Sequence, residues 1–482
     1  MQNIILIGLG YHARRIYFPV LQELQRKNII DQILIVDLKS QKKIIENYLY
    51  EKKSKNVEVL FLNGPFNNKL DENLEKNLSS IVKRRKIKGV IIATEPLAHM
   101  VYAKWAIKNR LSVLMDKPIS THEWIIHNEK YGKQLVTDYN ELVKMYQEAK
   151  KFNPQMVFAI MAQRRFHNAF KKMKEAIKEV YEYTSFPVTS IQSFHSDGQW
   201  RFPTEIINQT AHPYNQGYGK CSHSGYHFFD IVSWFMEGSD KKPDEMEVIS
   251  SFLTPNDFIN QYTFGDYRKN FKDFDKYNKY SEKEFVKRAK NFGEIDSFNN
   301  FTFKKNGKVM TLASINLCHN GFSQRNWATA DGRDLYKGNG RVRHESHYIL
   351  QGPFQAISYL SYQSKEVNPN LQNNLFGVGG EYHADVYIFR NSTFNPKWKC
   401  VEKFQVKDLI EREMKDKSRG HQEDARREAI LEFVENLQTG SQKIAKQSDL
   451  MQYERSIKMM SIVYRSMARR RKGLNPLVKI KT

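Results

Sequence analysis

A glycine-rich turn lies close to the start of the chain. The sequence Gly8-Leu9-Gly10-Tyr11-His12-Ala13 follows an apolar run, Asn3–Gly8, and precedes an amphipathic segment, Ala13–Lys27. In a GxGxxA turn between a strand and a helix, the first glycine permits the tight bend and the second lets the backbone approach a pyrophosphate. The phosphates then lie against the free N–H groups at the start of the helix. The pattern predicts a dinucleotide site that includes Gly8, Gly10, Tyr11, His12 and Ala13.

A carboxylate ends the second apolar run, Ile33–Asp37. At the end of the second strand of a dinucleotide-binding domain, an aspartate accepts hydrogen bonds from the hydroxyls of the adenosine ribose. The same negative charge repels the 2′-phosphate of NADP. Asp37 therefore favours NAD as the cofactor, while Lys39, two residues further on, keeps NADP possible.

A lysine and two histidines have the chemistry of hydride and proton transfer. Lys117 precedes Pro118 after an expected strand, Ser112–Met115, and a doubly wound sheet binds its ligand at the carboxyl ends of its strands. An ammonium group there can stabilise the alkoxide that develops as hydride leaves an alcohol. His227 can accept the proton of that alcohol, because an imidazole titrates near neutral pH. His223 lies four residues earlier, on the same face of an expected helix, and can orient His227 or relay its proton.

The same segment also suits a zinc ion. Two histidines four residues apart on a helix are zinc ligands, and Cys221 supplies a third ligand beside His223 and His227. His344 and His347 form a second, weaker pair. The sequence fixes no acidic ligand beside Cys221, His223 and His227, and we expect no metal site.

Two further segments carry a family pattern. The first runs Thr94-Glu95-Pro96-Leu97-Ala98-His99, then Ala103 and Ala106, then Met115-Asp116-Lys117-Pro118. The second contains Trp200-Arg201 and, after it, Gly225-Tyr226-His227-Phe228-Phe229-Asp230. Together they resemble the Gfo/Idh/MocA oxidoreductases, which include glucose–fructose oxidoreductase and inositol dehydrogenase.

Three positions depart from the pattern of that family. Pro96 lies one residue late, Asp116 replaces a glutamate, and His223 replaces an aspartate. A second imidazole does not hold His227 as a carboxylate would, and two protonated imidazoles repel each other. The role of His223 is therefore the most open part of the predicted site.

The resemblance implies a function and a set of site residues. It implies an NAD(P)-dependent oxidoreductase that transfers hydride between nicotinamide and a hydroxyl-bearing carbon of a sugar, sugar derivative or cyclitol. Two alternatives stay open: a redox-cycling lyase, hydrolase or epimerase with tightly bound NAD, and a non-catalytic dinucleotide-binding regulator. We expect a homodimer or homotetramer. The implied cofactor residues are Thr94, Pro96, His99, Asp116 and Lys117, the implied catalytic residues are Lys117, His227 and His223, and the implied substrate residues are Arg165, Trp200 and Arg201.

The apolar patterning predicts an α/β plus α+β protein with two domains. Residues 1–162 alternate buried strands with helices, which indicates a doubly wound, parallel Rossmann sheet. Residues 163–482 contain alternating, aromatic strands, which indicate an α+β substrate and oligomerisation domain on a mostly antiparallel open sheet. Insertions are expected near residues 260–292 and 320–380. The chain is expected to end in helices, the first with one apolar face formed by Ala425, Ala429, Phe433 and Leu437.

The composition of the 482 residues argues against several other classes of protein. No apolar run reaches the roughly 18 residues that a membrane span needs, and no basic region precedes the first apolar run. The 76 Lys and Arg outweigh the 53 Asp and Glu to give +23, but these basic residues are mostly scattered and lack interleaved aromatics, so no nucleic-acid partner is expected. The three cysteines lie far apart, which is typical of a cytoplasmic protein without a disulfide scaffold.

The position of Asp37 generates a prediction about cofactor choice. NAD(H) should bind more tightly than NADP(H) in calorimetric titrations of the wild-type protein. The Asp37→Ala variant should bind NAD(H) about tenfold or more weakly, because a hydrogen bond to a charged group contributes about 1.5–3 kcal/mol. Tighter binding of NADP(H) by the wild-type protein would contradict this prediction and would make Lys39 the residue that determines the choice of cofactor.

Overall fold

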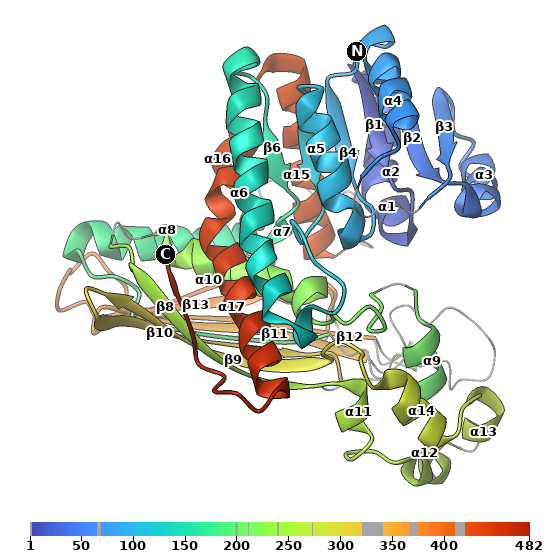
Figure 1. Ribbon diagram of the computed structural model, residues 1–482. Coiled ribbons are helices and arrows are strands. Elements are labelled where there is room, and N and C mark those ends of the chain that lie inside the picture. Colours follow the sequence, from blue (N-terminus) through green and yellow to red (C-terminus); the bar gives the residue numbers. More distant parts are fainter. Residues whose placement is uncertain are drawn as a thin grey trace. The chain divides into compact units, whose positions relative to one another are not determined.

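The computed structural model describes residues 2–64, 69–197, 201–210, 212–238, 241–271, 273–320, 341–365, 370, 374–409 and 420–482. Much of the expected insertion at 320–380, including the loop 332–340, lies outside these residues. The chain forms two compact units (Figure 1). Unit 1 contains Met1–Thr121, Val136–His167 and Gln422–Glu454, and unit 2 contains His122–Leu135, Asn168–His421 and Arg455–Thr482.

The core of unit 1 is a parallel six-stranded sheet, as the alternation of strands and helices predicts. Its strand order is β3-β2-β1-β4-β5-β6, which is the order of a doubly wound nucleotide-binding sheet. Strands β4 and β5 are buried along their whole length, and apart from Ser112 their residues are Gly, Val, Ile, Leu and Met, as burial on both faces requires. The bounds are β1 (Gln2–Ile7), β2 (Ile30–Leu38), β3 (Val57–Leu62), β4 (Gly89–Ile92), β5 (Ser112–Met115) and β6 (Phe158–Ile160).

Helices connect the strands of this sheet. The third to fifth of them cover the crossovers from β2 to β5, and each buries its apolar residues against the strands. The bounds are α1 (Tyr11–Arg15), α2 (Tyr17–Arg26), α3 (Lys42–Glu51), α4 (Glu72–Arg84), α5 (His99–Lys108), α6 (Glu129–Phe152) and α7 (Gln163–Phe166).

A segment near the C-terminus completes unit 1. Helix α15 (His421–Thr439) buries the predicted apolar face, and Phe433 is 0% exposed in the same core cluster as Ile4 and Ile91. Gly440 ends the helix with a φ of +75°, and α16 (Lys443–Ser448) follows. The expected division at residues 162 and 163 grouped these helices with the second domain, whereas their contacts are with the parallel sheet.

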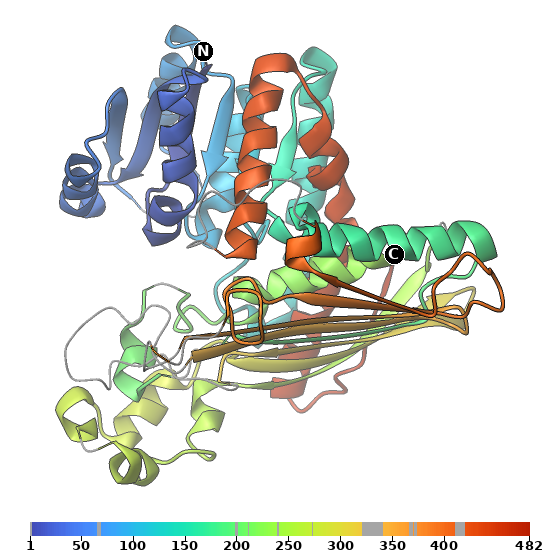
Figure 2. The same ribbon diagram turned by 180° about the vertical axis from the view of Figure 1, so that it is seen from behind.

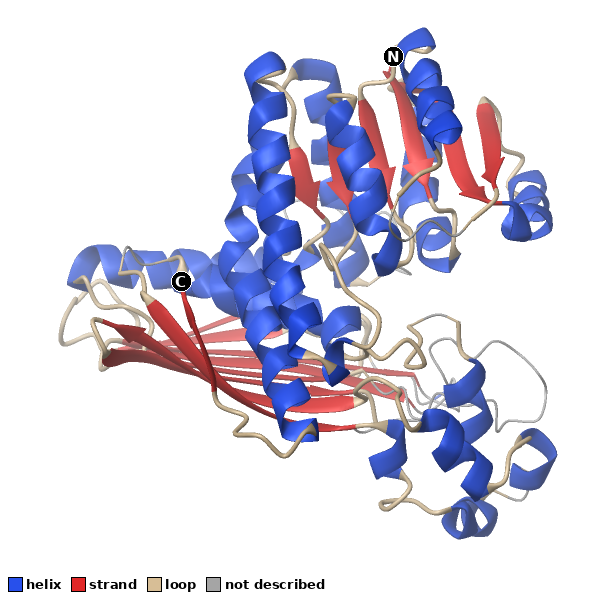
Figure 3. Ribbon diagram, in the orientation of Figure 1, coloured by secondary structure: helices blue, strands red, loops and turns tan. Residues whose placement is uncertain are grey.

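Unit 2 is built on a nine-stranded sheet with the order β14-β13-β12-β11-β7-β10-β9-β8-β15. Only the pair β7 and β10 is parallel, which confirms the prediction of a mostly antiparallel sheet. Figure 3 shows its strands in red. The bounds are β7 (Ser190–Ser196), β8 (Glu245–Leu253), β9 (Asp296–Lys305), β10 (Lys308–Cys318), β11 (Arg341–Gln351), β12 (Gln355–Lys365), β13 (Asp385–Arg390), β14 (Val401–Gln405) and β15 (Val478–Lys481).

One face of this sheet is covered by helices. Helices α8 (Asn168–Thr184) and α10 (Tyr226–Met236) lie along it (Figure 2), and α17 (Glu454–Arg471) is also almost entirely buried in unit 2. Strands β9 and β10 accordingly alternate buried and exposed residues. None of the helices among the described residues is long and apolar enough to cross a membrane.

The expected insertion near 260–292 is a small helical module. It contains α11 (Pro255–Phe258), α12 (Phe264–Asn270), α13 (Phe274–Tyr277) and α14 (Glu282–Ala289), and α9 (Pro203–Asn208) packs beside them. Reciprocal hydrogen bonds between Ser281 and Glu284 cap α14. The module has its own aromatic core around Tyr267 and Phe274.

The packing of α15 generates a prediction about stability. The Phe433→Ala variant should lower the free energy of unfolding by about 3–5 kcal/mol, because it opens a cavity in the core of unit 1. Tyr50, 87% exposed on α3, is the control, and Tyr50→Ala should change stability little. Urea unfolding followed by circular dichroism measures both variants, and equal small effects would contradict this role of α15.

Candidate functional site

The glycine turn of unit 1 has the backbone that its sequence predicts. Gly8 has a φ of +88°, and a methyl group on its Cα would lie 2.7 Å from the Ala93 carbonyl oxygen. Among the described residues, no side chain caps α1 at Gly10, and a methyl group there would meet no atom within 4 Å. Ala13 is fully buried. The turn therefore leaves room beside uncapped N–H groups, which fits a pyrophosphate.

Asp37 lies beside the same turn, at the end of β2. Its Oδ2 accepts a hydrogen bond from the Leu9 N–H at 2.6 Å, and its Oδ1 accepts one from the Leu38 N–H at 2.6 Å. Burial raises the pKa of Asp37 above its usual range, and the two N–H donors act against that rise. The carboxylate is thus held against the glycine turn, where the ribose of a bound dinucleotide would lie.

Asp116 and Lys117 directly follow β5, at the carboxyl edge of the parallel sheet. His12 Nε2, from the glycine turn, lies 3.5 Å from Asp116 Oδ2. Asp116 Oδ1 accepts the Lys117 N–H at 2.8 Å. Burial raises the pKa of Asp116, but the neighbouring His12, Lys117 and His99 outweigh it, and the net shift is downward. Asp116 is therefore a carboxylate at neutral pH and connects the first and fifth strands.

His99 supports the loop that carries Lys117. Its ring is fully buried at the start of α5, with Nδ1 2.7 Å from the Pro118 carbonyl oxygen and Nε2 3.1 Å from that of Thr94. The Lys117–Pro118 peptide bond is cis. Both nitrogens of His99 thus contact backbone carbonyls of unit 1. Direct contact of His99, Thr94 or Pro96 with the cofactor stays a prediction.

His223 lies in unit 2, on a π-helical turn (Cys221–Gly225) that leads into α10. Its ring is 2% exposed and stacks on the His212 ring, with centroids 4.8 Å apart and planes at 26°. The ring centroids of Tyr214, which is tilted, and of Tyr218, which is edge-on, lie 6.0 and 5.4 Å from that of His223. His227, the predicted proton acceptor, is 4% exposed in the first turn of α10. The imidazole of His223 is thus enclosed by other rings.

Close backbone packing shapes this turn. A methyl group on Gly219 would overlap the Glu294 carbonyl oxygen, and one on Gly225 would lie 2.6 Å from the Lys220 carbonyl oxygen. Cys221 Sγ lies 3.2 Å from Ser297 Oγ. Within the described part of the chain, no three or more His, Cys, Asp or Glu residues are arranged to hold a metal ion.

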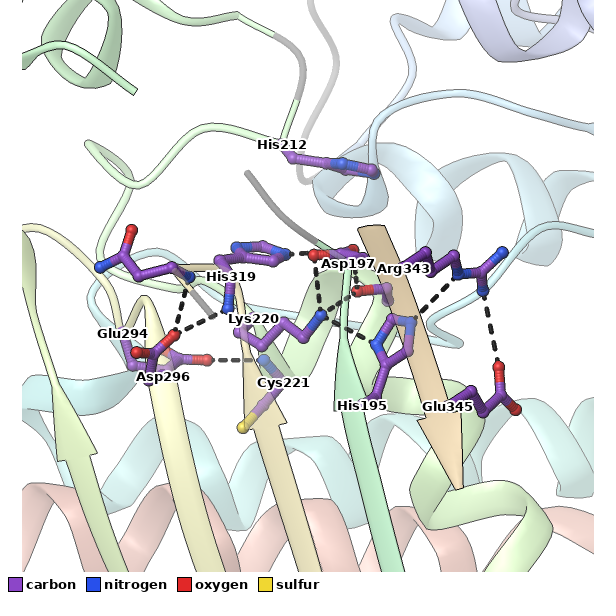
Figure 4. Close-up of polar contacts among 12 residues, drawn as sticks. His195, Asp197, His212, Lys220, Cys221, Glu294, Asp296, His319, Arg343 and Glu345 are labelled. Atoms are coloured by element: carbon purple, nitrogen blue, oxygen red, sulfur yellow. Dashed lines mark hydrogen bonds and ion pairs between the residues drawn. The ribbon is translucent and has the colours of Figure 1, made fainter. Parts of the chain in front are cut away.

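Lys220 is at the centre of a buried polar cluster near the carboxyl ends of β7 and β10 (Figure 4). Its Nζ is 3.0 Å from His195 Nδ1 and 2.9 Å from Ser224 Oγ. Asp197 Oδ1 lies 3.2 Å from Nζ, and Ser224 Oγ also donates to Asp197 Oδ2 at 3.1 Å. The Lys220 cluster, as we call it below, consists of His195, Asp197, Lys220, Ser224, His319, Arg343 and Glu345.

Arg343, on β11, extends the Lys220 cluster along the sheet. Its Nε donates to His195 Nε2 at 3.3 Å, and its Nη2 lies 3.6 Å from Glu345 Oε2. Glu345 Oε1 faces His347 Nε2 at 3.3 Å, and His347 Nδ1 lies 2.9 Å from Ser193 Oγ. The contacts therefore form a chain across the neighbouring strands β7 and β11.

His319, after β10, extends the Lys220 cluster toward His223. Its ring is nearly parallel to the His223 ring, with centroids 5.9 Å apart and planes at 15°. The Tyr214 hydroxyl contacts His319 Nδ1, and Asp197 Oδ2 lies 3.7 Å from Nε2. The His319 backbone N–H donates to Asp296 Oδ1 at 2.7 Å. Burial holds the pKa of His319 well below its usual range, which favours the neutral ring.

The sequence interpretation missed the Lys220 cluster. His195 and Arg343 are 148 residues apart in the chain, and a lone histidine in an expected strand gives no sign of its partner. One signal was available: polar and ionisable residues gather where β7 and β10 end, at His195-Ser196-Asp197 and at His319. Sequence reasoning did not join these two ends, because the parallel pairing of β7 with β10 was unknown.

The three predicted substrate residues have different positions. Arg165 is fully buried in unit 1, where its guanidinium lies 4.1 Å from the Tyr453 ring and donates to Gln452 Oε1 at 2.7 Å. Arg201 lies in unit 2, close enough to His319 that its charge helps to lower the pKa of that ring. Trp200 lies outside the described residues. Contact with substrate stays a prediction for all three.

Comparison with known proteins bears on the N-terminal part of the chain. Residues 2–153 match the model of the oxidoreductase family with an NAD-binding Rossmann fold, Gfo/Idh/MocA. This Rossmann domain belongs to the Gfo/Idh/MocA family. The match agrees with the segments around Thr94–His99 and Met115–Pro118, and it identifies NAD as the cofactor of the Gfo/Idh/MocA domain.

Solved structures share the fold over the whole chain. WlbA dehydrogenase from Bordetella pertussis, in complex with NADH and UDP-GlcNAcA, has a TM-score of 0.55 at 12% identity and covers 100% of this chain and 98% of its own. Levoglucosan dehydrogenase in complex with NADH and levoglucosan has a TM-score of 0.55 at 10% identity, and the match covers 100% of this chain and 99% of that one. A putative myo-inositol dehydrogenase from Sinorhizobium meliloti has a TM-score of 0.50 at 11% identity, and the match covers 100% of this chain and 99% of that one. At these identities the likeness shows the fold. No curated protein sequence matches the chain.

Glu294 generates a prediction about the pH dependence of stability. Its Oε1 accepts from the Cys221 N–H at 2.8 Å and from the Tyr464 hydroxyl at 3.1 Å, and burial raises the pKa of Glu294 to about 7. As the pH rises from about 4.5 to 7, the unfolded carboxyl loses its proton while the folded one keeps it, so this group lowers stability by about 3 kcal/mol across that window.

The Glu294→Gln variant removes this titration and keeps an oxygen acceptor. Relative to the wild-type protein, it should therefore be more stable at pH 8 than at pH 4.5, by up to about 3 kcal/mol. Glu182, an exposed residue of α8 that pairs with Lys178, is the control, since an exposed ion pair contributes little and Glu182→Gln should change stability little. Urea unfolding at the two pH values is the measurement, and a pH-independent effect of Glu294→Gln would contradict the prediction.

Proposed function

We propose that the protein is an NAD-dependent oxidoreductase that transfers hydride between nicotinamide and a hydroxyl-bearing carbon of a sugar, sugar derivative or cyclitol. The observation that carries the proposal is in unit 1. An NAD-binding glycine turn contacts Asp37, and Asp116 and Lys117 follow β5 at the same sheet edge. A doubly wound sheet binds its ligand at this edge. Bound NAD supplies the hydride acceptor.

The chain's own residues have separate roles in this proposal. Lys117 donates to the substrate oxygen and stabilises the negative charge that develops there as hydride leaves. Asp116 accepts the Lys117 backbone N–H and, with His99, holds the loop. His227 accepts the proton of the substrate hydroxyl. His223 orients the substrate or relays the proton.

The substrate class rests on the resemblance of the sequence motifs and on similar folds. Levoglucosan dehydrogenase and WlbA dehydrogenase were solved with a sugar derivative and a sugar nucleotide, respectively. The large apolar side chains exposed on the open sheet, among them Ile249, Phe298 and Leu312, support the proposal that the chain forms a homodimer or homotetramer. We propose the cytoplasm as its compartment, as its cysteine spacing suggests.

A substrate screen tests the activity. Purified protein with NAD⁺ is mixed with a panel of aldoses, amino sugars, sugar nucleotides and cyclitols, and reduced nicotinamide is followed by absorbance. Formation of NADH with at least one compound is expected. No reaction with any of them, in protein that binds NAD⁺, would overturn the oxidoreductase and favour a dinucleotide-binding regulator. NAD that stays bound and unchanged while sugar is converted would instead identify the redox-cycling alternative.

Variants of Lys117 and His227 test the assigned roles. Lys117→Ala should lose activity by about 10²-fold or more while NAD⁺ affinity is unchanged, because its role is in the transition state. His227→Ala should lose about 10²–10⁴-fold. Lys108→Ala removes a half-exposed lysine that pairs with Glu75 and is the matched control. A fully active Lys117→Ala enzyme would exclude Lys117 from the chemistry.

A further inference from the structure

The surroundings of Lys220 restrict its protonation state. Its side chain is 0% exposed, and its Nζ lies within hydrogen-bond distance of His195 Nδ1, Ser224 Oγ and, at 3.2 Å, Asp197 Oδ1. A lysine ammonium has three hydrogens and no lone pair, so it needs three acceptors. Ser224 and Asp197 can both accept. The charge of Lys220 therefore depends on which nitrogen of His195 has the proton.

Arg343 decides the tautomer of His195. The Nε–H of Arg343 points at His195 Nε2 across 3.3 Å, and a guanidinium can only donate. His195 Nε2 must therefore be the acceptor, and burial keeps the pKa of His195 well below its usual range, so the ring is neutral. The one ring proton is then on Nδ1, facing Lys220. Stacking on the Phe228 ring, with centroids 4.6 Å apart, holds the imidazole in this orientation.

An ammonium at Lys220 would direct its hydrogen at the hydrogen of His195 Nδ1. A neutral amine satisfies every group instead: its lone pair accepts from His195 Nδ1–H, and its two hydrogens go to Asp197 and Ser224. We propose that Lys220 is a neutral amine that stores the proton released when the substrate alcohol is oxidised. This second part rests on the proposed function.

The other charges around Lys220 are compatible with a neutral amine. Burial lowers the pKa of Lys220, while Asp197 on one side and Cys318 and Asp296 on the other raise it, and the net shift is downward. Of these groups, Asp197 follows β7, Cys318 ends β10 and Asp296 begins β9. The Asp296 carboxylate also accepts the His319 backbone N–H.

A chain of polar contacts joins Lys220 to the His223 region. Asp197 lies between them, with Oδ1 3.2 Å from Lys220 Nζ and Oδ2 3.7 Å from His319 Nε2. His319 in turn contacts the Tyr214 hydroxyl and stacks on the His223 ring. A proton that reaches Asp197 can pass to Nζ across one contact.

The proton balance closes without a further reactant. Oxidation of an alcohol by NAD⁺ gives a carbonyl compound, NADH and one proton, and that proton converts the Lys220 amine to an ammonium. The ammonium then faces the His195 Nδ1–H without a lone pair, which weakens its hold on the added proton. The arrangement that keeps the amine neutral thus also returns it to the neutral state.

Lysine NMR tests the protonation state without any substrate. In protein labelled with ¹³C at the lysine Cε atoms, one signal should already report a neutral amine at pH 7, so its midpoint should lie about three or more pH units below the ordinary value near 10.4. Lys220→Met should remove that signal. Lys304→Met is the matched control, because Lys304 lies in the same sheet paired with Glu247, and this variant should keep the Lys220 signal. A spectrum in which every lysine signal reports an ammonium at pH 7 would overturn the neutral amine.

His195→Asn tests the cause. An amide can turn its oxygen toward Nζ and accept from an ammonium, so the midpoint of Lys220 should rise by about one pH unit or more. An unchanged midpoint would overturn the role of His195. If Lys220→Met does not fold, the shift of the midpoint in His195→Asn still identifies the Lys220 signal.

Kinetics on a substrate found by the screen test proton storage. A Lys220 side chain that is already protonated cannot accept another proton. The kcat for oxidation should therefore fall as the pH is lowered through the Lys220 midpoint measured by NMR. In His195→Asn this acid-side fall of kcat should move to higher pH together with the Lys220 midpoint, and KM should change little. If the acid-side fall of kcat stayed at the same pH while the NMR midpoint of Lys220 moved, proton storage would be overturned. Failure of the proposed function would appear separately, as no turnover of any substrate with the NMR result intact.

Discussion

The pairing of buried polar groups is the constraint on which the arrangement of unit 2 depends. Strands β7 and β11, and the residues that directly follow β7 and β10, bring ionisable side chains to neighbouring positions in the Lys220 cluster. An isolated charge in such a place costs several kcal/mol, and an unmatched donor about 1–3 kcal/mol. Lys220, His195 and Asp197 are tolerated there only because each faces a partner. The pairing in turn requires the parallel neighbours β7 and β10 to end at the same level.

The π-helical turn also helps to place a partner beside Lys220. It begins directly after Lys220 and brings Ser224 Oγ to 2.9 Å from Nζ, while Gly219 and Gly225 allow the backbone to approach Glu294 and Lys220 closely. Extra residues in a helical turn are frequent at functional sites. Here the turn also contains His223, whose ring stacks on His212 and His319. The imidazole of His223 therefore has aromatic partners, and Asp197 Oδ2 lies 3.7 Å from Nε2 of the stacked His319 ring.

Unit 1 follows from simpler physics. A strand buried on both faces must be apolar throughout, and its ends must carry the polar residues that meet a ligand. The buried part of β1 is apolar from Ile4 to Ile7 and that of β5 from Val113 to Met115, and these runs end at Gly8 and at Asp116. The tight contact between Gly8 and the Ala93 carbonyl, and the contact of Asp37 with the Leu9 N–H, are made within a few ångströms of these ends.

The sequence alone was sufficient for the features that depend on neighbouring residues. The glycine turn, the order of strands and helices in residues 1–162, the apolar face of α15 and the stop at Gly440 are all local patterns, and the structure contains each of them. Only the tertiary structure decided which sheet α15 packs against, because an apolar face does not specify its partner. The same holds for Lys220, since its partners His195 and Asp197 lie 25 and 23 residues earlier, and Arg343 follows 123 residues later. A lysine in a sequence reads as a solvated cation, and its charge changes only when folding surrounds it with groups that water no longer reaches.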